Sequence, residues 1–178
     1  MVLLLALGGV PCSVHAESTA GVVPKQDQIK AAFLYNIPKF VEWPADRFAD
    51  PEAPIVIGVF SDGALRQQLE TIVKERKING RAVVIRQVSS AEEIKSAHLL
   101  FVRAEDDQKF AALGQAVRGS PVLTAGESPA FASAGGMFNF VLAGDRVRFE
   151  INMAAAERAQ LKVSAQLQKL AMAIRRAP

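Results

Sequence analysis

The middle of the chain alternates short apolar segments with segments of helical periodicity. Each apolar segment is rich in β-branched residues and closes on polar or turn-forming residues, which is typical of strands buried on both faces. The segments between them carry apolar residues three and four positions apart, as amphipathic helices do. This alternation predicts βαβ units and therefore a parallel sheet. The predicted strands are 54–60, 82–88, 98–102 and 121–124.

The predicted helices between these strands have recognisable ends. The segment 64–74 is amphipathic, and Ser90 with Glu93 matches a capping box that starts a short helix. Acidic residues at 105–107 favour the N-terminus of a third helix, which extends to about Val117. Each helix is therefore predicted to connect two strands of the parallel sheet.

Helices are also predicted at both ends of the domain. Residues 28–44 place apolar side chains near helical spacing, with a kink expected at Pro38. Two helical segments are expected near 154–161 and 164–174. The second of these carries an apolar stripe, formed by Leu167, Leu170, Ala171 and Ile174.

Residues 137–152 predict an antiparallel hairpin. Gly144 and Asp145 suit a two-residue hairpin loop, and such a loop sets the register of the two strands. In that register one face of the hairpin is wholly apolar and the other is mostly polar. The apolar pairs are Leu142 with Val147, Phe140 with Phe149, and Phe138 with Ile151.

These elements predict an α/β fold. We expect a mixed, mainly parallel sheet of about six strands with helices on both faces and a C-terminal antiparallel hairpin plus helix. A length of 178 residues is typical of one domain, and we expect a single domain over 17–178.

Residues 1–16 resemble a secretory signal peptide. An apolar run over 2–10 precedes small residues that end at Ala16, although a positively charged start is missing. The run is too short for a membrane span, and Pro11 before Cys12 departs from a lipoprotein signal. We therefore expect export and cleavage after Ala16. The alternative is a short, buried first element.

Composition narrows the chemistry of the remaining chain. Half of all residues are apolar and 22% are charged, which predicts a globular protein rather than a disordered one. Without residues 1–16 the chain has no cysteine, so disulfides and thiolate metal sites are excluded. His98 is then the one histidine, which leaves metal sites and histidine-based triads poorly supplied. Its position at the start of a buried strand favours a structural, hydrogen-bonded role.

Positive charge is concentrated at the C-terminal end. From Asp145 onward seven Lys and Arg residues face three Asp and Glu residues, whereas the whole chain has a net charge of +3. Such an end could meet nucleic acid, an anionic membrane surface or an acidic protein. Export argues against nucleic acid. The alternative is a solvated face that aids solubility.

Familiar catalytic and cofactor-binding motifs are missing from the sequence. It contains no G-x-G-x-x-G after the first strand, no P-loop, no H-E-x-x-H and no G-x-S-x-G. The carboxylates are scattered rather than paired. We therefore expect no enzyme activity, no cofactor and no metal.

Two sets of residues are candidates for binding. In an open α/β sheet a ligand crevice lies beyond the carboxyl ends of the strands, and a small anion or nucleotide could bind there. The alternative is that these polar residues cap the following helices. The crevice candidates are Ser61, Asp62, Arg103 and Thr124.

The second set is a candidate partner-binding surface. It combines the polar face of the hairpin, the basic C-terminal segment and Trp43, an aromatic that could anchor an interface although core burial is the alternative. Its members are Trp43, Asn139, Arg146, Arg148, Glu150, Lys162 and Arg175.

Several segments resemble the YfiR family of periplasmic regulators. The segments are distributed over residues 30–152, and the resemblance extends over nearly the whole chain after residue 16. They are KAAFLYN (30–36), KFVEWP (39–44), INGR (78–81), GSPVLT (119–124), GGMFNFV (135–141) and VRFEIN (147–152).

The resemblance implies a function. It implies a Gram-negative periplasmic protein that binds the periplasmic sensor domain of an inner-membrane diguanylate cyclase and holds the cyclase inactive. Release then raises cyclic di-GMP and promotes biofilm formation. It further implies a homodimer and an outer-membrane lipoprotein that sequesters the repressor. Some members contain disulfides, and since this chain cannot form them after cleavage, we expect no redox sensing.

Two other hypotheses stay open at this point. One is a small-ligand binding or sensing periplasmic protein, for an anion or nucleotide, without a cyclase partner. The other is a hydrolase with an unrecognised site, which would need a strand-end residue such as Asp62 for turnover.

Overall fold

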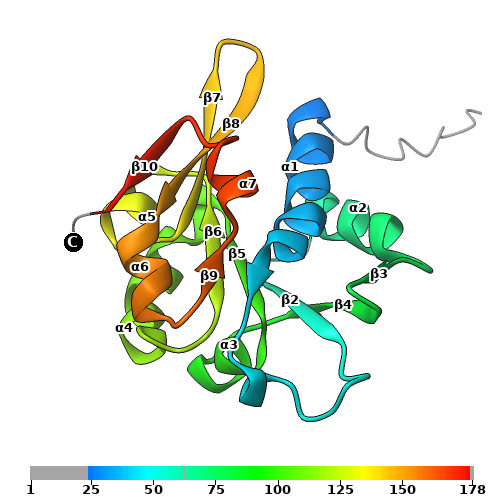
Figure 1. Ribbon diagram of the computed structural model, residues 1–178. Helices are drawn as coiled ribbons and strands as arrows, with labels where there is room; N and C mark the ends of the chain where they lie inside the picture. Colours follow the sequence, from blue (N-terminus) through cyan, green and yellow to red (C-terminus); the bar gives the residue numbers. More distant parts are fainter. Residues whose placement is uncertain (1–23, 62, 177–178) are drawn as a thin grey trace, which may run out of the picture.

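A computed structural model describes residues 24–61 and 63–176 of the chain. Within these residues eight strands form one mixed sheet in the order β10-β8-β7-β6-β5-β2-β4-β3 (Figure 1). The predicted signal peptide and Asp62 lie outside the described residues. The four predicted central strands are β2 (Ile55–Val59), β4 (Arg81–Gln87), β5 (Leu99–Val102) and β6 (Leu123–Gly126), and they pair in parallel.

The remaining strands extend the sheet at both edges. β7 (Phe138–Ala143) joins β6 in parallel, and β8 (Arg146–Asn152) runs antiparallel to β7. β10 (Ala173–Arg175) is parallel to β8, and β3 (Lys77–Ile78) is antiparallel to β4. The predicted fold class is confirmed. The sheet exceeds about six strands because the short strands β3 and β10 add to its edges.

Helices cover both faces of the sheet, as predicted. α1 (Lys25–Asn36) and α2 (Ala64–Val73) pack on one face and share a core with its apolar side chains (Figure 1). α3 (Ala91–Ser96), α4 (Asp107–Val117) and α5 (Pro129–Ser133) enclose a second core on the opposite face. β2, β5 and β6 are therefore buried on both sides, as predicted, whereas only Val83 of β4 is buried.

The short helix α5 was not expected from the sequence. Ser128 caps it by accepting the N–H of Phe131, and Phe131 is fully buried in the second core. The ring lies so close to the backbone that a Cβ at Gly126 would be 2.3 Å from it, and one at Gly136 would be 2.0 Å away. Glycine is therefore required at both positions for this packing.

The N-terminal helix ends earlier than predicted. α1 stops at Asn36, and a 3-10 turn, η1 (Ile37–Phe40), follows in place of a kinked α-helix. Pro38 explains the stop, because it has no N–H to donate and its ring clashes with the preceding turn. The chain then enters the two-residue strand β1 (Val41–Glu42), and a second 3-10 turn, η2 (Ala45–Arg47), leads to β2.

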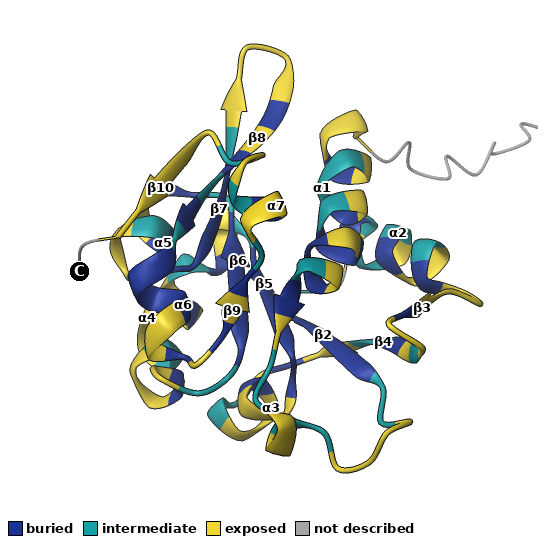
Figure 2. Cartoon of the chain, in the orientation of Figure 1, coloured by how far each residue is buried: buried dark blue, intermediate teal, exposed yellow. Residues whose placement is uncertain are grey.

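The hairpin β7–β8 has the predicted register. Phe138 pairs with Ile151, Phe140 with Phe149, and Leu142 with Val147. Five of these six side chains are buried, whereas Leu142 is 56% exposed. The tip extends beyond the helices that cover the sheet, and most of it is exposed (Figure 2).

The predicted helix over 164–174 is wrong. The chain forms α6 (Met153–Arg158), then β9 (Lys162–Val163), the single turn α7 (Ala165–Gln168) and β10. β9 pairs antiparallel with β1, and β10 adds to β8, so backbone pairing with distant strands replaces helical hydrogen bonds. Of the predicted stripe Leu167 is buried, Ala171 is partly buried, and Leu170 and Ile174 are exposed.

A group of four charged residues attaches α1 to the carboxyl ends of β5 and β6. Lys30 Nζ lies 2.5 Å from Glu127 and 3.7 Å from Asp27, while Arg103 lies 3.4 Å from Asp27 and 3.8 Å from Glu127. Asp27, at 6% exposure, is buried among them. Because a buried charge without a partner is costly, these contacts fix the position of α1 on the sheet.

His98 has the structural role that the sequence indicated. Its side chain is buried, Nδ1 accepts the N–H of Val56 at 3.1 Å, and the ring stacks on Phe48 at 4.6 Å. Burial, together with the positive charges of Arg47 and Arg81, lowers the pKa of His98 to about 4. The imidazole is therefore neutral in the folded protein at neutral pH.

We predict that Arg103→Gln lowers the free energy of unfolding by about 1–2 kcal/mol. Asp27 and Glu127 each lose an ionic partner, and the cost is moderate because Arg103 is partly exposed. Urea denaturation measures it. Arg86→Gln on β4 removes the same charge from an exposed position and should change stability by less than about 0.5 kcal/mol. Equal effects of the two changes would contradict this role.

We also predict that His98 makes stability pH-dependent. Between pH 6.5 and about 4 the unfolded chain binds a proton that folded His98 excludes, so stability falls as the pH falls through this range. The loss between pH 7 and pH 5 should be about 2 kcal/mol larger in the wild type than in His98→Asn. Denaturant titrations of both proteins at the two pH values measure it. If the stability of the two proteins changed equally with pH, His98 would bind its proton as readily in the folded protein as in the unfolded chain, which would contradict the lowered pKa.

Candidate functional site

The polar face of the hairpin brings together five of the predicted partner-binding residues. Arg146 and Arg148 are exposed on β8, and Glu150 follows on the same face. Asn139 on β7 lies directly opposite Glu150, and Arg175 on the neighbouring strand β10 forms an ion pair with Glu150 at 3.0 Å. These five residues therefore form a continuous region over three adjacent strands.

Within this region the residues differ in how they are engaged. The ion pair of Glu150 with Arg175 is part-exposed, so it adds little to stability. Asn139 is buried, and its Oδ1 has no hydrogen-bond partner in the part of the chain that the structure describes. The side chains of Arg146 and Arg148 are exposed. They are the residues of this face most available to a partner.

Trp43 and Lys162 lie apart from the hairpin face. Lys162 on β9 is exposed and pairs in register with Glu42 on β1, its Nζ 3.9 Å from that carboxylate. Trp43 is half-buried, with its ring edge-to-face against Phe48 and His98. The predicted surface thus divides into the hairpin face and this small two-stranded sheet.

The carboxyl ends of the central strands form a crevice too small for an organic ligand. Ser61 and Arg103 both line it, but its volume is about 40 Å³, which suits a few water molecules at most. The Ser61 hydroxyl donates to both oxygens of Asp106, at 2.9 Å each, and Lys109 also contacts Asp106. Asp62 lies outside the described residues.

Arg103 is likewise engaged within the protein. Burial alone would lower its pKa, but the carboxylates of Asp27, Glu127 and Glu105 outweigh burial and raise that pKa above its ordinary value. Its guanidinium is therefore a permanent cation held by internal acids rather than a free anion-binding group.

Thr124 does not join the other crevice candidates. The sequence placed it at the end of its strand, but β6 continues to Gly126, so Thr124 lies near the amino end. Its hydroxyl accepts the N–H of Met137 at 3.2 Å. Thr124 instead lines a separate, larger cavity between α4, α5 and α6.

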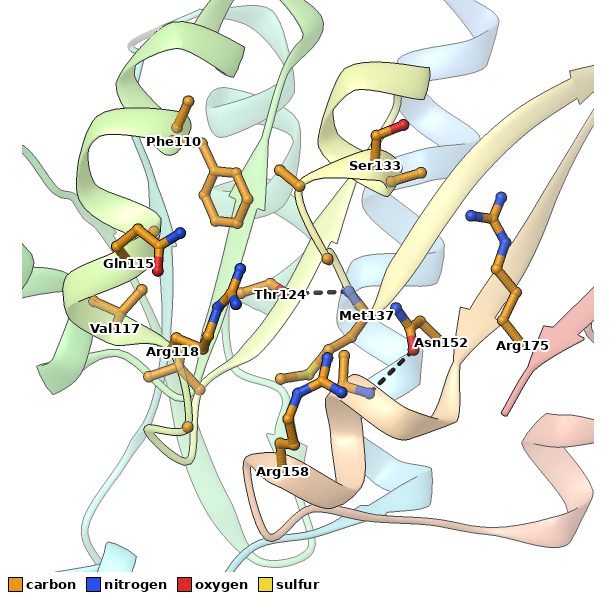
Figure 3. A pocket seen from close by; sticks show the side chains of 18 residues that line it. Phe110, Gln115, Val117, Arg118, Thr124, Ser133, Met137, Asn152, Arg158 and Arg175 are labelled. Carbon is orange, nitrogen blue, oxygen red and sulfur yellow. Dashed lines mark hydrogen bonds between the residues drawn. The ribbon is translucent and has the colours of Figure 1, made fainter. Parts of the chain in front are cut away.

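That larger cavity is lined by three arginines, of which only Arg175 was assigned to a candidate site from the sequence. Arg118, Arg158 and Arg175 all line it (Figure 3). The basic character of the C-terminal segment pointed to Arg158 and Arg175, whereas nothing in the sequence relates Arg118 to them. Arg118 directly follows α4, Arg158 lies in α6 and Arg175 lies in β10, so only the fold brings them together.

The described residues show neither a metal centre nor a membrane span. No three His, Cys, Asp or Glu side chains in 24–61 and 63–176 are grouped so as to hold a metal ion. Across the same residues, no helix combines the length and apolar character needed to cross a membrane.

Two solved structures show the same fold at low sequence identity. One is a conserved domain protein from Vibrio cholerae O1 biovar El Tor, with a TM-score of 0.52, 10% identity, and coverage of 84% of this chain and 60% of that chain. The other is the ABC domain in complex with L-Trp from Streptococcus pneumoniae, with a TM-score of 0.53, 13% identity, and coverage of 83% and 60%. This chain therefore spans about three fifths of either protein.

Sequence comparison identifies the family. No curated protein matches the chain significantly. The family model described as YfiR/HmsC-like matches residues 27–172, which includes every described strand except β10. The chain therefore belongs to the YfiR/HmsC-like family.

Proposed function

We propose that this protein is a periplasmic regulator that represses an inner-membrane diguanylate cyclase by binding its periplasmic sensor domain. Repression would lower cyclic di-GMP and biofilm formation. The observation that carries the proposal is membership of the YfiR/HmsC-like family over residues 27–172. Members of this family are regulatory rather than catalytic.

Export to the periplasm belongs to the same proposal. The apolar run and the small residues before position 17 support cleavage of a signal peptide, which would leave residues 17–178 as the mature domain. A homodimer and an outer-membrane lipoprotein that sequesters the repressor complete the proposed system. These partners are expected from the resemblance of the sequence to YfiR.

Binding rather than catalysis is the proposed activity. The regulatory character of the family supports it, and so does the state of the crevice. There, the polar groups of Ser61 and Arg103 already have internal partners, so they are poorly placed to act on a substrate. A regulator that binds without catalysing a reaction would act by occupying a surface of the cyclase.

The hairpin face is the proposed contact with the cyclase. The hairpin extends past the covering helices (Figure 2), and Arg146 and Arg148 are exposed on its polar face. Two exposed arginines on one face suit an acidic partner surface. Trp43 and Lys162 would contribute a second contact region.

We predict that the double substitution Arg146→Glu and Arg148→Glu weakens binding to the sensor domain at least about tenfold at low salt. Reversing two exposed charges replaces attraction by repulsion, and salt screens the difference. Isothermal titration calorimetry with the periplasmic sensor domain of a diguanylate cyclase from the same genome measures the affinities.

A matched control carries the same charge reversal elsewhere. Lys74→Glu with Arg86→Glu changes two exposed residues, one directly after α2 and one on β4, and should leave the affinity unchanged. Equal affinity of wild type and the Arg146/Arg148 variant, with circular dichroism showing an intact fold, would refute the hairpin face as the contact. A wild-type protein that binds no such sensor domain would refute the proposed function itself.

A further inference from the structure

A cavity of about 670 Å³ opens at the amino end of the parallel strands, between the α4–α5 layer and α6 (Figure 3). This volume is in the range of small-molecule sites in proteins. It is far larger than the 40 Å³ crevice at the opposite end of the sheet, and it lies away from the exposed arginines of the hairpin tip. The cavity therefore has room for an organic ligand that the crevice lacks.

Three arginines line this cavity, and none of the described residues lining it is acidic. Arg118 and Arg158 direct their side chains into it from adjacent walls (Figure 3). Neither guanidinium makes a hydrogen bond or an ion pair within residues 24–61 and 63–176, whereas Arg175 is paired with Glu150. Two unpaired guanidinium groups in one cavity repel each other and favour an anion between them.

The neutral polar groups of the cavity also present donors. Asn152 Oδ1 accepts the N–H of Ala155, which leaves the Asn152 amide N–H₂ available to a ligand. The Thr124 hydroxyl accepts from Met137 and retains its own hydrogen for donation. A site that combines several donors with cations and contains no acid is complementary to an acidic group.

The rest of the wall is apolar. Phe110, Val122 and Met137 line it together with several alanines. An inorganic ion would leave this apolar surface in contact with water, whereas an organic anion would cover it. The wall therefore favours a ligand with an apolar body attached to its acidic group.

We propose that this cavity is a binding site for a small organic anion, a phosphate ester or a carboxylate with an apolar body, whose acidic group lies between Arg118 and Arg158. The site differs from the strand-end crevice that the sequence indicated. It does not depend on a cyclase partner, so it stands or falls separately from the proposed function.

Titration of the full-length protein with simple probes tests the site. Phenyl phosphate and benzoate represent the two kinds of acidic group, inorganic phosphate lacks the apolar body, and benzyl alcohol lacks the charge. We expect saturable binding of at least one aryl anion by calorimetry, tighter than inorganic phosphate, and no binding of benzyl alcohol. The stronger of the two aryl anions identifies the acidic group that the site prefers.

Variants connect the binding to this cavity. Arg118→Gln and Arg158→Gln should each weaken aryl-anion binding about tenfold or more, because each removes a charge-assisted contact. Ser133→Phe narrows the cavity without changing its charge and should weaken binding. Arg86→Gln removes one positive charge from β4 and should leave the affinity unchanged.

Three results would overturn the proposal. One is the absence of saturable binding of either aryl anion up to about 10 mM, tenfold above the Kd of a weak millimolar site. Another is equal weakening by Arg86→Gln and Arg158→Gln, which would indicate general charge attraction. The third is unchanged binding to a folded Ser133→Phe variant. If the arginines instead contact acidic side chains of a protein partner, the first result is the one expected.

Discussion

The architecture depends on burying the central strands on both faces. Every residue of β2, β5 and β6 is buried, so helical layers must cover each side of the sheet. α1 and α2 provide one layer, and α3, α4 and α5 provide the other. Because hydrophobic burial is the dominant favourable term in folding, this requirement fixes where the helices lie and, with them, which strands stay accessible.

The accessible regions lie where this coverage ends. The hairpin extends past the helices, which exposes its polar face and leaves even Leu142, on its apolar face, in contact with solvent. At the amino end of the sheet the α4–α5 layer meets α6 across a cavity instead of a packed contact. The carboxyl end is closed by the ion pairs that hold α1, so the usual ligand position of an open α/β sheet is occupied by the protein itself.

The sequence predicted those features of the fold that depend on interactions between residues close together in the chain. The register of the hairpin follows from a two-residue loop, and the capping box at Ser90 forms as expected. The prediction of a C-terminal helix was wrong because hydrophobic periodicity carries no information about pairing with strands far away in the sequence. Lys162–Val163 pairs with β1, and Ala173–Arg175 pairs with β8. The exposure of Leu170 has the same cause, since a stripe of apolar residues at helical spacing does not show whether a core is there to cover it.

The sequence could not predict that Arg118 and Arg158 line one cavity, because forty residues and several elements separate them.

The central claim is that this YfiR/HmsC-like protein restrains a diguanylate cyclase from the periplasm. Cellular cyclic di-GMP measures that activity directly, in a strain that expresses the cyclase with or without the exported protein. The account predicts that the nucleotide level falls when the protein is exported, and that the effect disappears when the periplasmic sensor domain of the cyclase is deleted. A cyclic di-GMP level that does not respond to the exported protein, with the cyclase active and intact, would contradict the account.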